Sequence, residues 1–174
     1  KNKVKITNLG QRLNQALASK VAELKKYQSD FFKSIKEAIG DRDDIIISGD
    51  RFIFPSEVFF KSGSDIIQIE GVEKLRKVAI NLKEVSKKIP DKIDWILRVD
   101  GHTDKVPINN EKFNSNWHLS SSRAINIVKF FIAEGIEPHR LVAAGFGEYY
   151  PIDKGSSILS LQKNRRIEIK LTTR

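Results

Sequence analysis

Apolar residues recur at three- and four-residue steps in three stretches of the chain, the spacing of a helix with one buried face. The first stretch covers residues 8 to 39 and ends at Gly40. The second covers about 71 to 89 and ends before Pro90, and the third follows SNWHLS and ends at Gly135. Glycine and proline commonly stop helices. The pattern predicts three amphipathic helices, of which the first is roughly 45 Å long at 1.5 Å per residue.

Apolar or alternating runs between these helices predict strands. DIIISGDRFIF indicates two short strands joined by a hairpin turn at Gly49-Asp50. DWILRV is apolar throughout and predicts a strand buried on both faces. RLVAAGFG and NRRIEIKLTT predict two more strands. With the hairpin counted once, the order after the long helix is therefore strand, helix, strand, helix, strand, strand.

This order predicts an α/β fold, a two-layer sandwich with helices packed on a mixed sheet and a long helix in front. Residues 1–50 would hold the long helix and the start of the hairpin as a linker region, and residues 51–174 would form the domain. The long helix has two interpretations, a connector or dimerising helix, or a helix folded back on the domain. The pattern alone does not choose between them.

The composition excludes some chemistry. The chain has no cysteine, so it forms neither disulfides nor thiolate metal sites. It also has no methionine, from which we expect a further segment upstream of Lys1. No run of about 18 apolar residues is present, so no membrane span is expected within these residues.

The formal net charge is +9, with a pI near 9.7. A basic balance favours anionic partners such as nucleic acid, anionic lipid or an acidic polymer, or reflects a lysine-rich solvated surface. No arginine-rich run is interleaved with aromatic residues, so we do not expect a nucleic-acid partner.

The end of the third predicted strand is the first candidate site. In open α/β sheets, ligands bind beyond the carboxyl ends of strands, and WILRV is followed by polar residues up to Asp104. Asp104 accepts charge-assisted hydrogen bonds and Thr103 donates or accepts them. The plainer alternative is that Asp104 only caps a turn.

An arginine near the start of the third predicted helix is the second candidate. If Ser120 is the N-cap, Arg123 lies in the first turn, where its charge opposes the helix dipole. Such a cation indicates a buried partner carboxylate or an anionic ligand, since the planar guanidinium suits carboxylates. An internal Asp104–Arg123 salt bridge is the plain alternative.

The three histidines, His102, His118 and His139, show none of the short spacings of metal sites. We therefore expect structural or hydrogen-bonding histidines, no metal, no cofactor and no catalytic residue. A metal hydrolase that uses His102, Asp104 and His118 remains the enzyme alternative.

Four motifs then carry a resemblance. GHTD after a strand, NWHLSSSRA at a helix start, GFGEYYP after the next strand and NRRIEI on the last one occur in this order. Together they resemble the OmpA-like peptidoglycan-binding domain, in the form found in MotB-type stator proteins, over roughly residues 53–174. The resemblance implies noncovalent anchoring to the cell wall without catalysis.

The resemblance also implies a ligand and a setting. The ligand is the diaminopimelate of the peptidoglycan stem peptide, which carries an ammonium and a carboxylate. The protein would be a homodimer anchored in the inner membrane by a span upstream of residue 1, with this chain in the periplasm. A motor stator and a simple envelope tether both remain open.

Carried over by motif, the site residues are few. Arg123 would bind the ligand carboxylate and Asp104 its ammonium, with neutral contacts from Thr103 and Asn116. The remaining two positions are Leu119 and Arg165. The sequence departs from the pattern in the loop at 152–163, where SSILSLQK replaces the usual glycine-arginine pair, and this affects the role expected of Arg165.

Overall fold

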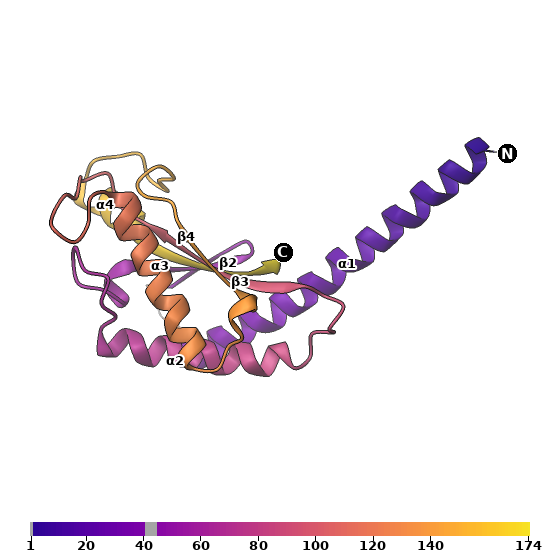
Figure 1. Ribbon diagram of the computed structural model, residues 1–174, viewed down its shortest axis with the longest axis horizontal. Helices are drawn as coiled ribbons and strands as arrows, with labels where there is room; N and C mark the ends of the chain where they lie inside the picture. Colours follow the sequence, from indigo (N-terminus) through magenta and orange to yellow (C-terminus); the bar gives the residue numbers. More distant parts are fainter. Residues whose placement is uncertain (1, 41–44) are drawn as a thin grey trace.

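The structure is a computed structural model that describes residues 2–40 and 45–174 of the chain (Figure 1). Helices and strands alternate along it as the hydrophobic pattern predicts. The elements are α1 (Asn2–Ile39), β1 (Ile46–Ser48), β2 (Arg51–Pro55), η1 (Ser56–Val58), α2 (Ile69–Ser86), β3 (Trp95–His102), α3 (Asn116–Ala133), η2 (Pro138–Arg140), β4 (Leu141–Gly145), α4 (Ile158–Asn164) and β5 (Arg166–Thr173).

The strands form one mixed sheet in the order β1-β2-β5-β3-β4. The β3–β4 pair is parallel and the other pairs are antiparallel. The α/β fold class, the mixed sheet and the hairpin at Gly49, which has a φ of +61°, are thus confirmed. The predicted order missed three short helices, namely η1, η2 and α4. Helix α4 is capped by the Ser157 side chain and lies in the segment expected to be a loop.

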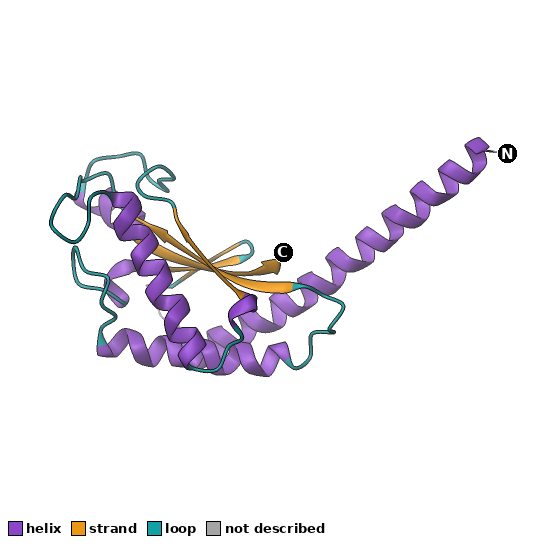
Figure 2. Ribbon diagram, in the orientation of Figure 1, coloured by secondary structure: helices purple, strands orange, loops and turns teal. Residues whose placement is uncertain are grey.

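The two faces of the sheet differ because residues alternate between them. Ile169 of β5 lies opposite Phe52 of β2 and Val99 of β3, and all three are buried under the helices. Helices α2 and α3 cover this face as the second layer of the sandwich (Figure 2). The other face carries charged side chains, among them Asp100 opposite Glu168.

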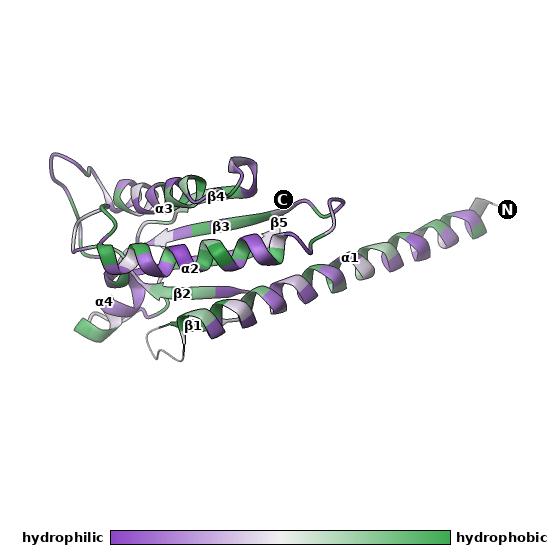
Figure 3. Cartoon of the chain, turned by 90° about the horizontal axis from the view of Figure 1, so that it is seen from below, coloured by the Kyte–Doolittle hydropathy of each residue, from purple (hydrophilic) through white to green (hydrophobic). Residues whose placement is uncertain are grey.

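Helix α1 is folded back on the domain only in its last part, as one interpretation of the long helix predicted, and the connector or dimerising role stays a prediction. Phe31 and Ile35, near its end, are fully buried in the same core as α2 and the sheet. Its first half projects away from the domain and carries a row of exposed apolar residues. Figure 3 shows hydrophobic positions recurring along this part of the helix. These residues, 52–70% exposed, are Val4, Ile6, Leu9, Leu13, Leu17 and Val21.

Strand β3 is longer than its apolar run predicted and continues through Gly101 to His102. Gly101 permits a close approach of α3, because a Cβ there would overlap the carbonyl oxygen of Ser120. A Cβ at Gly145 of β4 would likewise overlap Ser121. These two glycines bring the N-terminal half of α3 against the ends of β3 and β4, and so toward Thr103 and Asp104.

Within the described part of the chain, none of the helices has the combination of length and apolar content needed to span a membrane.

Candidate functional site

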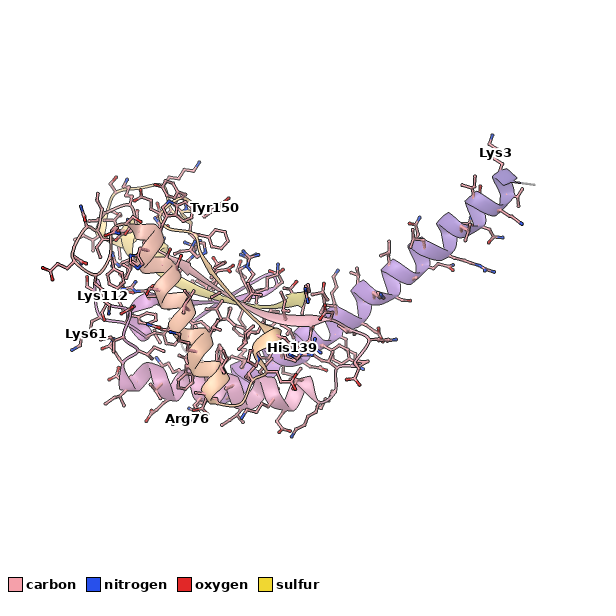
Figure 4. All side chains as sticks on the ribbon, in the orientation of Figure 1. Lys3, Lys61, Arg76, Lys112, His139 and Tyr150 are labelled. Atoms are coloured by element: carbon pink, nitrogen blue, oxygen red, sulfur yellow. The ribbon has the colours of Figure 1, made fainter. Side chains whose placement is uncertain are left out.

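A cavity of about 660 Å³ lies where β3 ends. It is at the end of the domain that carries Lys61 and Lys112 in Figure 4, away from Lys3 on the projecting part of α1. The segment after β2, the loop after β3, α3 and the end of α4 form its walls. All six residues selected from the motifs line this one cavity: Thr103, Asp104, Asn116, Leu119, Arg123 and Arg165.

The local reasoning that selected Arg123 was wrong, although the residue lines the cavity. The N-cap of α3 is Ser115, whose hydroxyl accepts a hydrogen bond from the His118 backbone N–H at 3.3 Å. Arg123 therefore lies in the third turn rather than the first. The helix dipole weakens within one turn, so it does not oppose this cation.

Neutral groups hold the Arg123 side chain. Its Nε donates to the Ser64 carbonyl at 2.8 Å and its Nη2 to the Lys61 carbonyl at 3.2 Å. The guanidinium carbon lies 5.1 Å from the centre of the Phe60 ring. Arg123 is 4% exposed, and burial lowers its pKa to about 10, so it stays charged at neutral pH. Among the described residues, no carboxylate forms an ion pair with it, so the predicted internal bridge to Asp104 does not form.

Asp104 pairs with a different cation. Its Oδ2 accepts from Nη1 of Arg165 at 2.7 Å, while its Oδ1 accepts from the Val106 backbone N–H at 2.9 Å. The plain interpretation of Asp104 as a turn cap is thus correct for one oxygen. Arg165 also donates from Nε to Glu57 at 2.7 Å. Arg165 therefore bridges two carboxylates at the wall of the cavity.

Asn116 and Thr103 hold the loop that carries Asp104. The Asn116 amide donates to the carbonyls of Asp104 and Val106 at 3.3 and 3.0 Å, and to the Glu148 carboxylate at 3.2 Å. The Thr103 hydroxyl donates to the Asp104 carbonyl at 2.8 Å. Buried hydrogen bonds of this kind fix the loop on the first turn of α3.

Sequence reasoning missed Glu57, which belongs to η1 and lines the cavity. It lies 108 positions before Arg165, and no local motif marks it. With Glu57 included, the cavity holds two carboxylates and two guanidiniums. The nearest charges are therefore balanced, and a ligand with one group of each sign would meet a partner for both.

The alternative metal trio does not come together. His118 packs edge-on against Phe113, with ring centres 5.4 Å apart, and its Nδ1 accepts from the Asn114 backbone N–H. His102 lies on the outer face of the sheet, in a second cavity of about 390 Å³ that does not include Asp104.

His102 instead lies with Asp100 and Glu168, with one potential ligand atom from each within 4.8 Å of the others. Both carboxylates are already bound by arginines: Asp100 by Arg98 at 2.7 Å, and Glu168 by Arg166 at 2.8 Å and Arg51 at 2.6 Å. These cations would repel a metal ion, so we interpret the group as a salt-bridge network. We call it the outer-face cluster; its members are Arg51, Arg98, Asp100, His102, Arg166 and Glu168.

His102 makes no hydrogen bond through either ring nitrogen within the described residues, and it stacks on Phe146 with ring centres 4.8 Å apart. Burial, and next the charge of Arg166, lower its pKa to about 4. His102 is therefore neutral at pH 7, and its role is in packing rather than hydrogen bonding.

Relatives of this chain are found by sequence and by structure. Motility protein B of Bacillus subtilis is 34% identical over 118 residues, which make up 67% of this chain and 42% of that protein. A MotB-like protein from Desulfovibrio vulgaris shares the fold, with a TM-score of 0.76 at 24% identity over 89% of this chain and 96% of that one. The cell wall anchor of the T6SS from Pseudomonas aeruginosa has a TM-score of 0.63 at 25% identity, over 87% and 97%.

The chain spans about half the length of the curated relatives it matches. The model of the OmpA family matches residues 59–165, which include the ends of β3 and β4 and the whole of α3. Because this match covers more than half of the chain, the chain belongs to the OmpA family.

Proposed function

We propose that this chain binds peptidoglycan without catalysis, and that the diaminopimelate of the stem peptide enters the cavity at the end of β3. The observation that carries the proposal is the state of Arg123, a buried cation oriented by two carbonyls and unpaired with any carboxylate of the described residues. A buried charge without a counter-ion is costly, and a ligand carboxylate would supply one.

The other end of the ligand would use Asp104. A side-chain ammonium would approach the Oδ2 that Arg165 now contacts, and would share this carboxylate with Arg165 or displace it. Arg165 is one-third exposed and retains Glu57 as a second partner, so the loss of its contact with Asp104 costs little free energy. The ligand is thus recognised by a cation and an anion on separate elements, and both charges are needed.

The relatives support a setting in the cell envelope. Motility protein B and a cell wall anchor are among them, and solved structures of MotB are of its periplasmic domain. We propose that this chain is a periplasmic domain of a protein anchored in the inner membrane, as a stator component or an envelope tether. The apolar row on the projecting half of α1 would pair with a second copy, and two sites on one polymer bind more tightly than one.

The test uses two changes in the cavity and a matched pair outside it. Asp104→Asn keeps an acceptor for the Val106 N–H and removes the negative charge, and Arg123→Ala removes the guanidinium that would bind the ligand carboxylate. We expect each to weaken binding to a soluble diaminopimelate stem peptide by about tenfold or more, the range of one charge-assisted hydrogen bond. Titration calorimetry and co-sedimentation with purified sacculi measure this. The controls are Arg76→Ala and Asp91→Asn, which change exposed charges elsewhere.

A matched ligand separates the two charges. A stem peptide with lysine in place of diaminopimelate keeps the ammonium and lacks the side-chain carboxylate. The unaltered protein should prefer the diaminopimelate peptide, and Arg123→Ala should lose that preference. If neither cavity variant changes binding, the site is wrong. Binding that disappears with salt and ignores Asp104 would instead indicate a general polyanion binder.

A further inference from the structure

Two large aromatic side chains form an exposed pair beside the cavity. Trp117, in the first turn of α3, and Tyr149, in the loop after β4, stack with ring centres 5.0 Å apart and an angle of 27° between the rings. Even so, Trp117 remains 49% exposed and Tyr149 58% exposed. We call the two rings the aromatic platform. Indole and phenol side chains with an apolar body and a polar end are typical of binding surfaces.

The platform is attached rigidly to the cavity wall. Both rings lie over Gly147, where an added Cβ would be 3.4 Å from Trp117 and 3.3 Å from Tyr149. The Gly147 carbonyl accepts from the Thr103 backbone N–H at 2.9 Å, and its N–H donates to Ser120 Oγ at 3.0 Å. Thr103 lines the cavity, so one residue separates the cavity wall from the rings.

The residues just before the two rings are also joined. Asn116, which precedes Trp117, donates to the carboxylate of Glu148, which precedes Tyr149, at 3.2 Å. Asn116 lines the cavity as well. The first turn of α3 and the loop after β4 are therefore held together at the point where each presents a ring. A ligand in the cavity that extends past Asn116 would meet a surface whose position is already set.

We propose that the aromatic platform is a subsite for the sugar rings of the glycan strand whose stem peptide occupies the cavity. This inference rests on the proposed function. A pyranose ring presents C–H groups on its faces and hydroxyls around its edge. Its faces pack on flat aromatic rings while the hydroxyls remain hydrated. Peptidoglycan supplies a sugar and a peptide in every repeat, so one repeat can reach both parts of the site.

The size of the platform favours a sugar over a protein partner. An aromatic side chain buries at most about 150–250 Å², and half of each ring is already covered. The free area is then roughly 200 Å², against about 800 Å² for one side of a specific protein interface. One or two sugar rings match the smaller area.

The test compares ligands with and without sugar. Trp117→Ala and Tyr149→Ala should each weaken binding of a muropeptide that carries its disaccharide by about tenfold, the upper range for one aromatic contact. The same variants should bind the sugar-free stem peptide within about twofold of the unaltered protein, since both ligand charges are met in the cavity. Trp117→Phe should restore most of the muropeptide affinity. The matched control is Tyr150→Ala. Tyr150, labelled in Figure 4, is 61% exposed and lines the outer-face cavity instead.

Fluorescence provides a readout without any peptide. The chain has two tryptophans, and Trp95 is 7% exposed, so a surface ligand should act on the emission of Trp117. Glycan strands stripped of peptides by an amidase should change this emission, and the change should be absent in Trp117→Phe.

The outcomes separate the two proposals. If the unaltered protein does not bind the stem peptide, the proposed function fails. If it binds that peptide through Asp104 but the platform variants bind the muropeptide normally, only the sugar subsite is wrong. An equal loss for both ligands would show that the rings support the cavity instead of touching sugar, and would also overturn the inference.

Discussion

Adjacent residues at the end of β3 belong to two different sites, the cavity and the outer-face cluster, and these sites differ in how their charges are arranged. His102 belongs to the cluster, and Thr103 and Asp104 belong to the cavity. In the cluster, each buried carboxylate is bound by at least one arginine, and Glu168 by two. In the cavity, the contacts that hold the buried Arg123 within the described ranges come from two carbonyls and an aromatic ring.

This difference distinguishes a structural group from a binding group. In a closed network of opposite charges, each charged group already has an ion-pair partner, so none is left to bind a ligand. A buried cation that is oriented by neutral dipoles, and that no carboxylate of the described residues pairs with, is prepared for an anion from a ligand. The number of charges is thus a poor guide to a site, and the nature of their partners is a better one.

Arg165 and Arg166 allow the sharpest test, because neighbouring arginines enter the two different regions. Arg166→Ala removes a buried partner of Glu168, and breaking a buried pair costs about 3 kcal/mol or more of folding stability. Arg165→Ala removes a one-third-exposed residue and should cost about 1 kcal/mol or less. Urea unfolding measures both. Binding of the stem peptide should change in Arg165→Ala and not in Arg166→Ala. The reverse result would contradict the assignment of Arg165 to the binding site and of Arg166 to the structural network.

We expect low pH to reduce the folding stability of the protein through the outer-face cluster. With a pKa of 6.5 when unfolded and about 4 when folded, His102 takes up a proton on unfolding between these values. Its contribution to stability is therefore complete above pH 6.5 and is lost as the pH falls to 4, by about 3 kcal/mol. The pKa of Asp100 is raised, mainly by burial, so this group increases folding stability as the pH falls. The pKa of Glu168 is lowered, so this group, like His102, decreases folding stability as the pH falls.

His102→Phe keeps the stacking on Phe146 and removes the titrating group. The slope of unfolding free energy against pH should flatten between 4 and 6.5, as measured by urea unfolding at several pH values. An unchanged slope would assign the acid sensitivity to the carboxylates alone.

The smallest expected effect concerns Glu57. Glu57→Gln leaves Arg165 with Asp104 as its remaining carboxylate partner, so Arg165 should compete more strongly with a ligand ammonium. We expect about a twofold to threefold loss of stem-peptide affinity and little change in stability, since this pair is partly exposed. Calorimetry with Glu148→Gln for comparison measures this. Tighter binding in Glu57→Gln would mean that Glu57 holds Arg165 in the way of the ligand.

Most of the fold could be predicted, and the errors have physical causes. The helices and strands were found because their apolar periods differ, and Ile167, Ile169 and Leu171 are an example of a strand recognised in this way. The start of α3 was misplaced because Ser115 and Ser120 are equally good caps in isolation. Ser115 is the cap because Asn116, just after it, is tied to the loop at Asp104 and Val106, a contact between distant segments. Helix α4 has seven residues, too few for a periodic signal.

The sequence by itself determined the two-layer fold and six of the side chains that line the cavity, because periodicity and motif order are local properties. Tertiary structure alone decided the partners of those side chains. Asp104 pairs with Arg165 across 61 positions, and Arg123 bonds to carbonyls 59 and 62 positions away. Charged groups attract any opposite charge within reach, so their pairing depends on which strand ends and helix turns the packed core brings together.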